Sequence, residues 1–444
     1  MWSLPDYPLA EEIGNPSLFV GREKEMKRLL HWAEQTKPRN SKSMAMLSRR
    51  KKGKTALLQR FFNILYMRND PRLIPFYYRI PEAKQTKRDF TRMFYRRVLT
   101  QYFAFTTRTP QWVGTILTLD ELKDLAASDK IVADDIRRME EMLDRAPTSA
   151  WPYAQEVGAR ISQLKDVRII QILDEFQYMN KYIVSDHDSQ EVELFCHSYM
   201  GAAETKFSPQ IVAGSHIGWL TEILRHLTVR YERWRLGSLS DAEALEAVYN
   251  YASIFQVTVT EKTAPYVAEV CANDPYYIAA TITHHADRKD LTTEDGVRDA
   301  LTYETKTNQG DIADVWGEYL AGAFDLVSQV NSKRIVLYLA NRDPEERDRE
   351  QIRKDLELEL TDVELAESLH RLIMADIVAP GSTAFHYRGL GDHIFDMVFR
   401  RLHGEEIDRV GPEQIDDDFK NELASLKGKL SVQKRELAEM AQTS

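Results

Sequence analysis

The sequence predicts an α/β fold, with a parallel sheet wrapped by helices in the first half of the chain and a mainly helical second half. Up to about residue 239, short apolar runs alternate with amphipathic helical patterns, as in βαβ units. From Ser240 onward the helical period dominates until a small hairpin pattern near the end. The predicted strands are Met44–Leu47, Leu73–Ile80, Val167–Leu173, Gln210–Ala213 and Trp234–Leu236.

The length of 444 residues exceeds what one ordinary core supports, so several domains are expected. We expect the sheet domain over residues 1–239, with a helical insertion at about 111–166. A helical domain follows over residues 240–310. Three helical patterns and a hairpin, Asp376–Val378 with Ala384–Tyr387, then favour a winged-helix domain over residues 311–403. A polar, helix-prone tail over residues 404–444 completes the chain.

The composition bounds the class of protein. Charged residues make up 29% and hydrophobic residues 43%, as in soluble globular chains. No apolar run approaches the roughly 18 residues of a membrane helix, and the N-terminus has no secretory pattern. The two cysteines lack metal-ligand spacing, which favours a reducing, cytoplasmic location. A net charge of -10 argues against a general nucleic-acid coat, because neutralising phosphates needs a positive surface.

A glycine-lysine-threonine motif follows the first predicted strand. It lies between that strand and an amphipathic helix. In a P-loop, the glycine lets the backbone approach phosphates, the lysine reaches the β- and γ-phosphates, and the hydroxyl coordinates Mg²⁺. We therefore expect ATP and Mg²⁺ here, with Lys54 on the phosphates and Thr55 on the metal, although Ser48 replaces the first glycine of the pattern. The predicted nucleotide contacts of this loop are Ser48, Arg49, Arg50, Lys51, Lys52, Gly53, Lys54, Thr55 and Ala56.

A second motif ends the strand Val167–Leu173. Asp174 and Glu175 follow that apolar run, as in a Walker B strand. Asp174 is expected to hold Mg²⁺, directly or through water, and Glu175 to act as general base toward the attacking water. Ser215, or else His216, at the tip of the neighbouring strand is expected to touch the γ-phosphate or that water. A glycine-serine turn is equally typical of plain strand-to-helix punctuation.

With these residues, the chain resembles the archaeal-type ATPases, a branch of the AAA+/STAND P-loop NTPases, from about Pro16 to Leu402. Phe19–Glu25 is similar to the family's N-terminal GRE box, which places Gly21 and Arg22 near the adenine. Leu173–Gln177 is similar to its Walker B segment, and Gly214–Trp219 to its sensor turn. The resemblance implies a P-loop domain, a helical lid and a winged helix.

Two further residues come from this resemblance alone. Arg233 stands in a Tyr-Glu-Arg stretch where the family often has Tyr-Gly-Arg, which makes it a candidate arginine finger or phosphate sensor. A solvated or salt-bridged arginine is an equal alternative, because Arg230 and Arg235 flank it. Pro275 stands in a segment similar to the family's G-x-P-Y-Y lid motif and is expected near the base, although Asn273 replaces the glycine.

The expected function is therefore an ATPase that acts as a nucleotide-dependent switch or assembly factor, with a homo-oligomer and a partner protein as expected partners. The alternative is an ATP-held adaptor whose winged helix binds DNA or a partner protein with little turnover. Mixed charges over residues 311–403 favour a protein partner over DNA. A GTPase or small-molecule kinase is a weaker interpretation, because no Asn-Lys-x-Asp guanine motif follows the Walker B strand.

Overall fold

The computed structural model describes residues 7–185, 195–199, 202, 204–225, 230–283, 290–324 and 329–408. The chain divides into two compact units, residues 1–239 (unit 1) and residues 240–444 (unit 2). Over the residues just given, no helix has the length and apolar character that crossing a membrane requires.

Unit 1 is built on a five-stranded sheet in the order β2-β4-β6-β1-β7. Every neighbouring pair in this sheet is parallel. The predicted α/β class with a parallel sheet is therefore confirmed. In this order β6 lies between β1, which precedes the P-loop, and β4, which ends at Asp174. The strands are β1 (Ser43–Leu47), β2 (Leu73–Arg79), β4 (Arg168–Asp174), β6 (Gln210–Gly214) and β7 (Tyr231–Arg235).

The central strands are buried on both faces, which explains their continuous apolar sequences. All residues of β1, β4 and β6 are buried, as expected where helices cover both sides of a parallel sheet. At the edge, the predicted strand Trp234–Leu236 was wrong in its limits. Strand β7 begins at Tyr231, because backbone pairing with β1 starts at Ser43 opposite Tyr231 and ends at Leu47 opposite Arg235.

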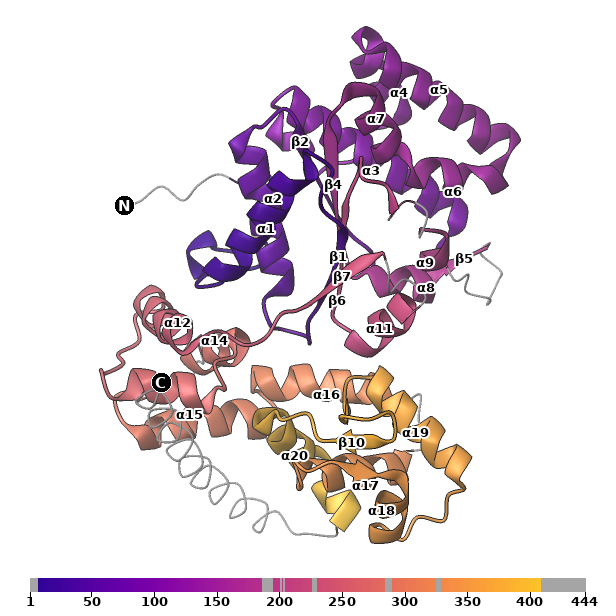
Figure 1. Ribbon diagram of the computed structural model, residues 1–444. Coiled ribbons are helices and arrows are strands. Elements are labelled where there is room, and N and C mark those ends of the chain that lie inside the picture. The colour runs from indigo at the N-terminus through magenta and orange to yellow at the C-terminus, as the bar shows by residue number, and fades with distance from the viewer. Residues whose placement is uncertain are drawn as a thin grey trace. The chain divides into compact units, whose positions relative to one another are not determined.

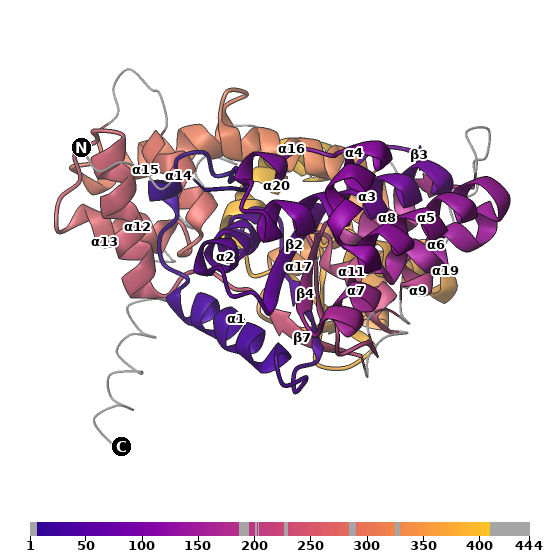
Figure 2. The same cartoon turned by 90° about the horizontal axis from the view of Figure 1, so that it is seen from above.

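Helices lie on both faces of the sheet. Figures 1 and 2 show α1 and α2 on one side and α3 and α7 on the other. Between α3 and β4 the chain forms mainly helices. The helices up to β4 are η1 (Pro16–Leu18), α1 (Glu23–Thr36), α2 (Lys54–Arg68), α3 (Lys87–Thr106), η2 (Pro110–Trp112), α4 (Leu119–Leu125), η3 (Ala126–Ser128), α5 (Lys130–Arg145), α6 (Pro147–Gln155) and α7 (Val157–Lys165).

Short elements follow β4 and complete the described part of unit 1. A two-stranded parallel sheet joins β3 to β5. These elements are β3 (Gln85–Thr86), η4 (Phe176–Tyr178), α8 (Met179–Tyr182), β5 (Ile183–Val184), α9 (Phe195–Ser198) and α11 (Ile217–Arg225).

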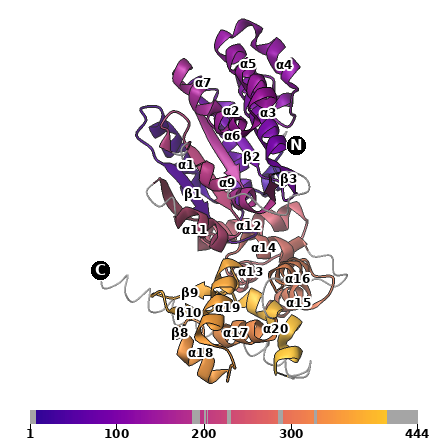
Figure 3. The ribbon, with the colours of Figure 1, turned by 90° about the vertical axis from the view of Figure 1, so that its right-hand side faces the viewer.

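Unit 2 begins with helices and ends with a region that contains a small sheet. The sheet is three-stranded and antiparallel, in the order β8-β10-β9, and Figure 3 shows it beside α17, α18 and α19. The helices are α12 (Asp241–Ile254), α13 (Thr263–Val270), α14 (Pro275–Thr283), α15 (Glu294–Lys306), α16 (Asp311–Phe324), α17 (Gln329–Ala340), α18 (Arg349–Asp355), α19 (Asp362–Met374) and α20 (His393–Asp408). The strands are β8 (Arg347–Asp348), β9 (Ala379–Pro380) and β10 (His386–Arg388).

The predicted hairpin was placed too early in the chain. Residues 376–378 form a turn after α19, since Asp376 is left-handed (φ 53°) and Ile377 and Val378 are buried. The hairpin pairs Pro380 with Tyr387, and its partner strand β8 was not predicted. Helix α20 continues to Asp408, and the rest of the predicted tail, residues 409–444, lies outside the described residues.

Candidate functional site

The loop between β1 and α2 has the backbone of an anion site. Gly53 is left-handed (φ 79°) and precedes α2 without a side-chain hydrogen bond to the helix. Gly53 therefore offers the first amides of α2 no side-chain acceptor, and these amides carry the positive end of the helix dipole. Lys51 is also left-handed (φ 66°). Ser48 is not left-handed, so a glycine is not needed there; it is buried, and its hydroxyl donates to the carbonyl of Arg49 at 3.0 Å.

Lys54 and Thr55 meet the carboxylates at the end of β4. The Lys54 ammonium donates to Asp174 Oδ1 and lies 3.4 Å from Glu175 Oε1. The Thr55 hydroxyl donates to Asp174 Oδ2 at 2.7 Å. Lys54, Asp174 and Glu175 are all buried. The structure thus brings together the predicted phosphate-binding lysine, both predicted metal ligands and the predicted general base.

The electrostatics of this cluster favour ionised groups despite burial. Desolvation works against the charged form of Lys54, but the carboxylates of Asp174 and Glu175 outweigh it and raise the lysine pKa. Burial would raise the pKa of Glu175, yet the charge of Lys54 and hydrogen bonds from Ser215 and Gln177 lower it below its ordinary value. At neutral pH, Glu175 is therefore an anion that can accept a proton.

Glu175 is also held from the side of β6. It is left-handed (φ 53°), so the chain turns sharply after β4. Its Oε2 accepts hydrogen bonds from the Ser215 hydroxyl at 2.8 Å and from the Gln177 side-chain amide at 2.6 Å. Ser215 therefore contacts the predicted base. Gln177 was not predicted as a site residue, although it is the last residue of the Walker B-like segment Leu173–Gln177.

A tyrosine beside Asp174 was also missed. Tyr77 lies on β2, and its hydroxyl is 3.4 Å from Asp174 Oδ2. The parallel register places Arg79 opposite Asp174, two residues farther along the same strand. Neither residue carries a motif, so only the pairing of β2 with β4 could have identified them.

Arg22 connects the P-loop to the chain after β7. It follows the left-handed Gly21 and is buried. Its guanidinium donates to the Lys52 carbonyl at 2.9 Å and to the Gly237 carbonyl at 2.8 Å. Lys52 adds a bond to the Ser238 hydroxyl at 3.1 Å. Arg22 therefore holds the loop in position through backbone contacts, and its predicted place near the adenine stays a prediction.

The remaining residues of the predicted loop lie around this cluster. Arg49, Arg50 and Ala56 are half-buried, and Lys51 is exposed. His216 stacks on Trp219 with ring centroids 5.1 Å apart. Burial lowers the pKa of His216 to about 4, so its imidazole is neutral at pH 7.

Two predicted residues are placed away from the P-loop contacts. Arg233 lies within β7, paired with Ala45, and its guanidinium donates to the Leu224 carbonyl at 2.9 Å. Pro275 begins α14 in unit 2. Two residues earlier, Asn273 is left-handed (φ 53°), a conformation that asparagine tolerates better than most residues. This explains how asparagine can stand where the resembled family has glycine. The roles of Arg233 and Pro275 stay predictions.

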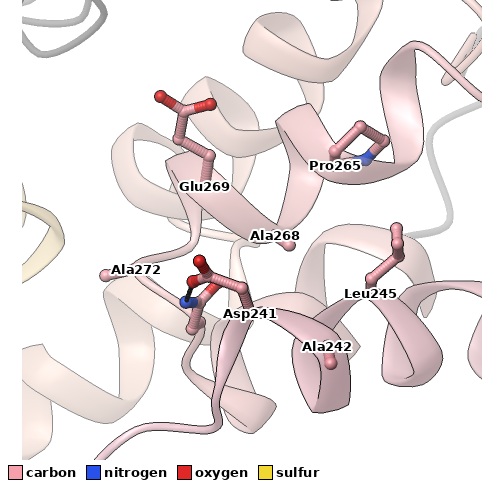
Figure 4. A pocket seen from close by; sticks show the side chains of 8 residues that line it. Asp241, Ala242, Leu245, Pro265, Ala268, Glu269 and Ala272 are labelled. Atoms are coloured by element: carbon pink, nitrogen blue, oxygen red, sulfur yellow. Dashed lines mark hydrogen bonds between the residues drawn. The ribbon is translucent and has the colours of Figure 1, made fainter. Parts of the chain in front are cut away.

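Unit 2 holds a pocket of about 440 Å³ between α12 and α13 (Figure 4). Asp241 and Glu269 lie on its lining, and Asp241 accepts a hydrogen bond from Asn273 at 2.7 Å. Acidic groups disfavour a triphosphate, so the P-loop edge of unit 1 remains the better candidate. Across the described ranges, no three His, Cys, Asp or Glu side chains form a metal-binding group. Thr55 and Asp174 stay the predicted Mg²⁺ ligands.

Solved structures identify the fold. A Walker-type ATPase of Pyrococcus abyssi, PABY2304, is similar with a TM-score of 0.57 and 14% identity, over 86% of this chain and 96% of that chain. The chain has a P-loop NTPase fold. The Orc2 protein of Aeropyrum pernix is similar with a TM-score of 0.47 and 12% identity, over 86% of this chain and 95% of that one. The RuvB Holliday junction branch migration motor of Thermotoga maritima is similar with a TM-score of 0.35 and 14% identity, over 83% of this chain and 92% of that chain.

No protein-family model and no curated protein matches the sequence. At 14% identity, the similarity to the Pyrococcus abyssi protein shows the P-loop NTPase fold alone, and the chemistry of the site follows from this chain's own residues.

Proposed function

We propose that the chain binds ATP with Mg²⁺ and hydrolyses it, and that it acts as a nucleotide-dependent switch or assembly factor. The observation that carries this proposal is the buried cluster in which Lys54 of α2 contacts both Asp174 and Glu175 at the end of β4. A lysine, a hydroxyl and a carboxylate pair at the carboxyl edge of a parallel sheet are the groups that phosphoryl transfer to water requires.

The residues present fit both the nucleotide and the metal. The uncapped N-terminus of α2 and the Lys54 ammonium match an anionic triphosphate. The Thr55 hydroxyl and the Asp174 carboxylate are oxygen ligands of the kind that Mg²⁺ prefers. When bound, Mg²⁺ supplies positive charge that offsets the charge on the phosphate oxygens.

Lys54, Glu175 and Ser215 have different roles in the proposed hydrolysis. Lys54 exchanges its carboxylate contacts for the β- and γ-phosphate oxygens when ATP binds. Glu175 accepts a proton from the attacking water, whose oxygen bonds to the γ-phosphorus while the bond to the leaving ADP oxygen breaks. Ser215, which already contacts Glu175, is near enough to orient the same water. Glu175 is the residue on which hydrolysis, as distinct from binding, depends.

The order of elements in unit 2 supports a winged-helix domain. Helix α17, strand β8, helices α18 and α19, and the hairpin β9-β10 follow one another in the order of that motif. Among the exposed side chains of α19, the carboxylates of Asp362, Glu364 and Glu367 outnumber the one arginine, Arg371. Because these carboxylates would repel DNA phosphates, a protein partner is favoured for this domain.

The alternative function, an ATP-held adaptor with little turnover, is supported by the same domain. It predicts ATP binding without phosphate release, and a binding partner for unit 2. DNA binding that weakens steeply with salt would favour DNA as that partner. Particle size measured with and without ATP tests the proposed nucleotide-dependent homo-oligomer, and Arg233→Ala tests whether that arginine acts in turnover.

The experiment that tests the proposed chemistry compares wild type with Glu175→Gln. We expect ATP binding to remain and phosphate release to fall by about 10²–10⁴-fold, the usual contribution of a general base. The control is Glu269→Gln in unit 2, which makes the same chemical change outside the cluster. Normal phosphate release in Glu175→Gln would remove Glu175 from its proposed role.

A further inference from the structure

The two oxygens of the Glu175 carboxylate are held unequally. Oε2 accepts the Gln177 side-chain amide at 2.6 Å, the Ser215 hydroxyl at 2.8 Å and the Ser215 backbone amide at 3.3 Å. Among the described contacts, Oε1 has one, with the Lys54 ammonium at 3.4 Å. Three donors therefore occupy one oxygen, while the other keeps most of its capacity to accept.

The orientation of the Gln177 amide follows from this arrangement. An ionised carboxylate only accepts, so the NH₂ end of the amide must face Glu175. The carbonyl end faces Gly214, where an added Cβ would lie 2.0 Å from Gln177 Oε1. Gln177 is 1% exposed, and no described residue hydrogen-bonds to its Oε1. The NH₂ group of Gln177 is thus hydrogen-bonded to Glu175, whereas its buried carbonyl oxygen accepts no hydrogen bond from the described residues.

We infer that Gln177 is a positioning residue that holds Oε2 of Glu175 and leaves Oε1 as the oxygen that takes the proton of the attacking water. This inference rests on the proposed hydrolysis. In that reaction the proton moves from water to Oε1, the water oxygen bonds to the γ-phosphorus, and the electron pair of the broken bond leaves with ADP. Gln177 itself neither gains nor loses a proton; it fixes the direction in which Glu175 accepts one.

The inference has a kinetic signature that a merely structural residue would lack. Without the Gln177 donor, Oε2 of Glu175 keeps only the contacts from Ser215, so the carboxylate is no longer fixed with Oε1 open to accept. Because Glu175 acts on the attacking water and not on the bound nucleotide, kcat should fall while the Kd for ATP stays the same.

The test is Gln177→Met, which keeps the side-chain length and removes the donor, with Gln171→Met on the preceding strand β4 as its control. For Gln177→Met we expect kcat to fall about 10–100-fold, as when a residue that orients a reactive group is lost. We expect the Kd for ATP to stay within about twofold. Gln171 contacts Ser208 and Tyr199 instead of Glu175, so Gln171→Met should leave kcat per folded molecule unchanged.

A second variant keeps the inference testable if Gln177→Met does not fold. Gln177→Glu is nearly isosteric and replaces the donor with a carboxylate that repels Glu175, so kcat should fall at least as far as in Gln177→Met. Unchanged kcat in either folded variant would overturn the role of Gln177 while leaving the proposed function intact. If wild type and Glu175→Gln release phosphate equally, the proposed function fails, and this inference fails with it.

Discussion

Two carboxylate clusters of unit 1 look alike at first and differ in how completely they are satisfied. Asp135 of α5 accepts the Tyr95 hydroxyl and an Arg160 nitrogen on one oxygen, and the Tyr153 hydroxyl and another Arg160 nitrogen on the other, at 2.7–3.1 Å. At the end of β4, by contrast, Asp174 and Glu175 share a single lysine. The first cluster is closed, whereas the second keeps acceptor capacity on Glu175 Oε1.

This difference distinguishes Asp135, a carboxylate that stabilises the fold, from Glu175, a carboxylate that can still accept a proton. A bidentate arginine and two tyrosines occupy both oxygens of Asp135. Because Tyr95 lies on α3, this cluster connects the helical insertion to that helix. A lysine shared by two carboxylates can move to a phosphate without leaving either one unpaired once Mg²⁺ is bound. Burial and ion pairing alone would not have distinguished the two sites.

The largest expected effect comes from making the same Asp→Asn change in both clusters. In Asp174→Asn we expect ATP turnover to fall about 10–100-fold, because a metal-holding oxygen is lost. In Asp135→Asn we expect normal turnover per folded molecule and a loss of roughly 3 kcal/mol in the free energy of unfolding, because Arg160 loses its buried partner. Steady-state phosphate release and urea unfolding measure the two effects. The reverse pattern would contradict the assignment of the clusters.

A smaller effect follows from the lowered pKa of Glu175. A folded-state pKa below the ordinary value of 4.5 means that ionised Glu175 stabilises the fold. That stabilisation is present above about pH 4.5 and is lost as the pH falls through the folded-state pKa. Wild type should therefore lose stability relative to Glu175→Gln as the pH drops from 7 to below 4, by about 1–3 kcal/mol in urea unfolding. A constant difference between the two proteins would show that Glu175 is not held as described.

An effect of similar size concerns the contact between Gly214 and Gln177. Gly214→Ala places a Cβ 2.0 Å from Gln177 Oε1, so the glutamine must shift. We expect a loss of about 1–3 kcal/mol, as for overpacked cores. Gly114→Ala is the matched control, because no atom lies within 4 Å of its added Cβ. Equal thermal stability of the two variants would mean that the contact between Gly214 and Gln177 places no constraint on the fold.

Much of the fold could be predicted because its signals are local. Strands β1, β2, β4 and β6 are largely apolar runs, and the motifs of the site follow directly after β1 and β4. The limits were less accurate where pairing decides them. Strand β7 extends back to Tyr231 because β1 pairs with it there. Strand β9 starts after Val378 because Ile377 and Val378 are buried within the turn that follows α19.

The contacts within the site could be predicted only in part. Lys54, Thr55, Asp174 and Glu175 belong to motifs, so their meeting was foreseeable. The clamp of Gln177 and Ser215 on Glu175 joins residues 40 positions apart, and it depends on β6 lying beside β4. The bonds of Arg22 to Lys52 and Gly237 likewise depend on three loops meeting, which no local pattern encodes.

The most direct test of the account is calorimetric binding of ATP in the presence of Mg²⁺ to wild type, Lys54→Ala and Lys165→Ala. Lys165 pairs with Asp129 at 2.6 Å in the helical insertion, so it is the matched lysine outside the site. We predict that wild type and Lys165→Ala bind about one ATP per chain with equal affinity, and that Lys54→Ala loses most of this affinity because the phosphates lose their main cation. Equal binding by Lys54→Ala, or no binding by wild type, would contradict the account.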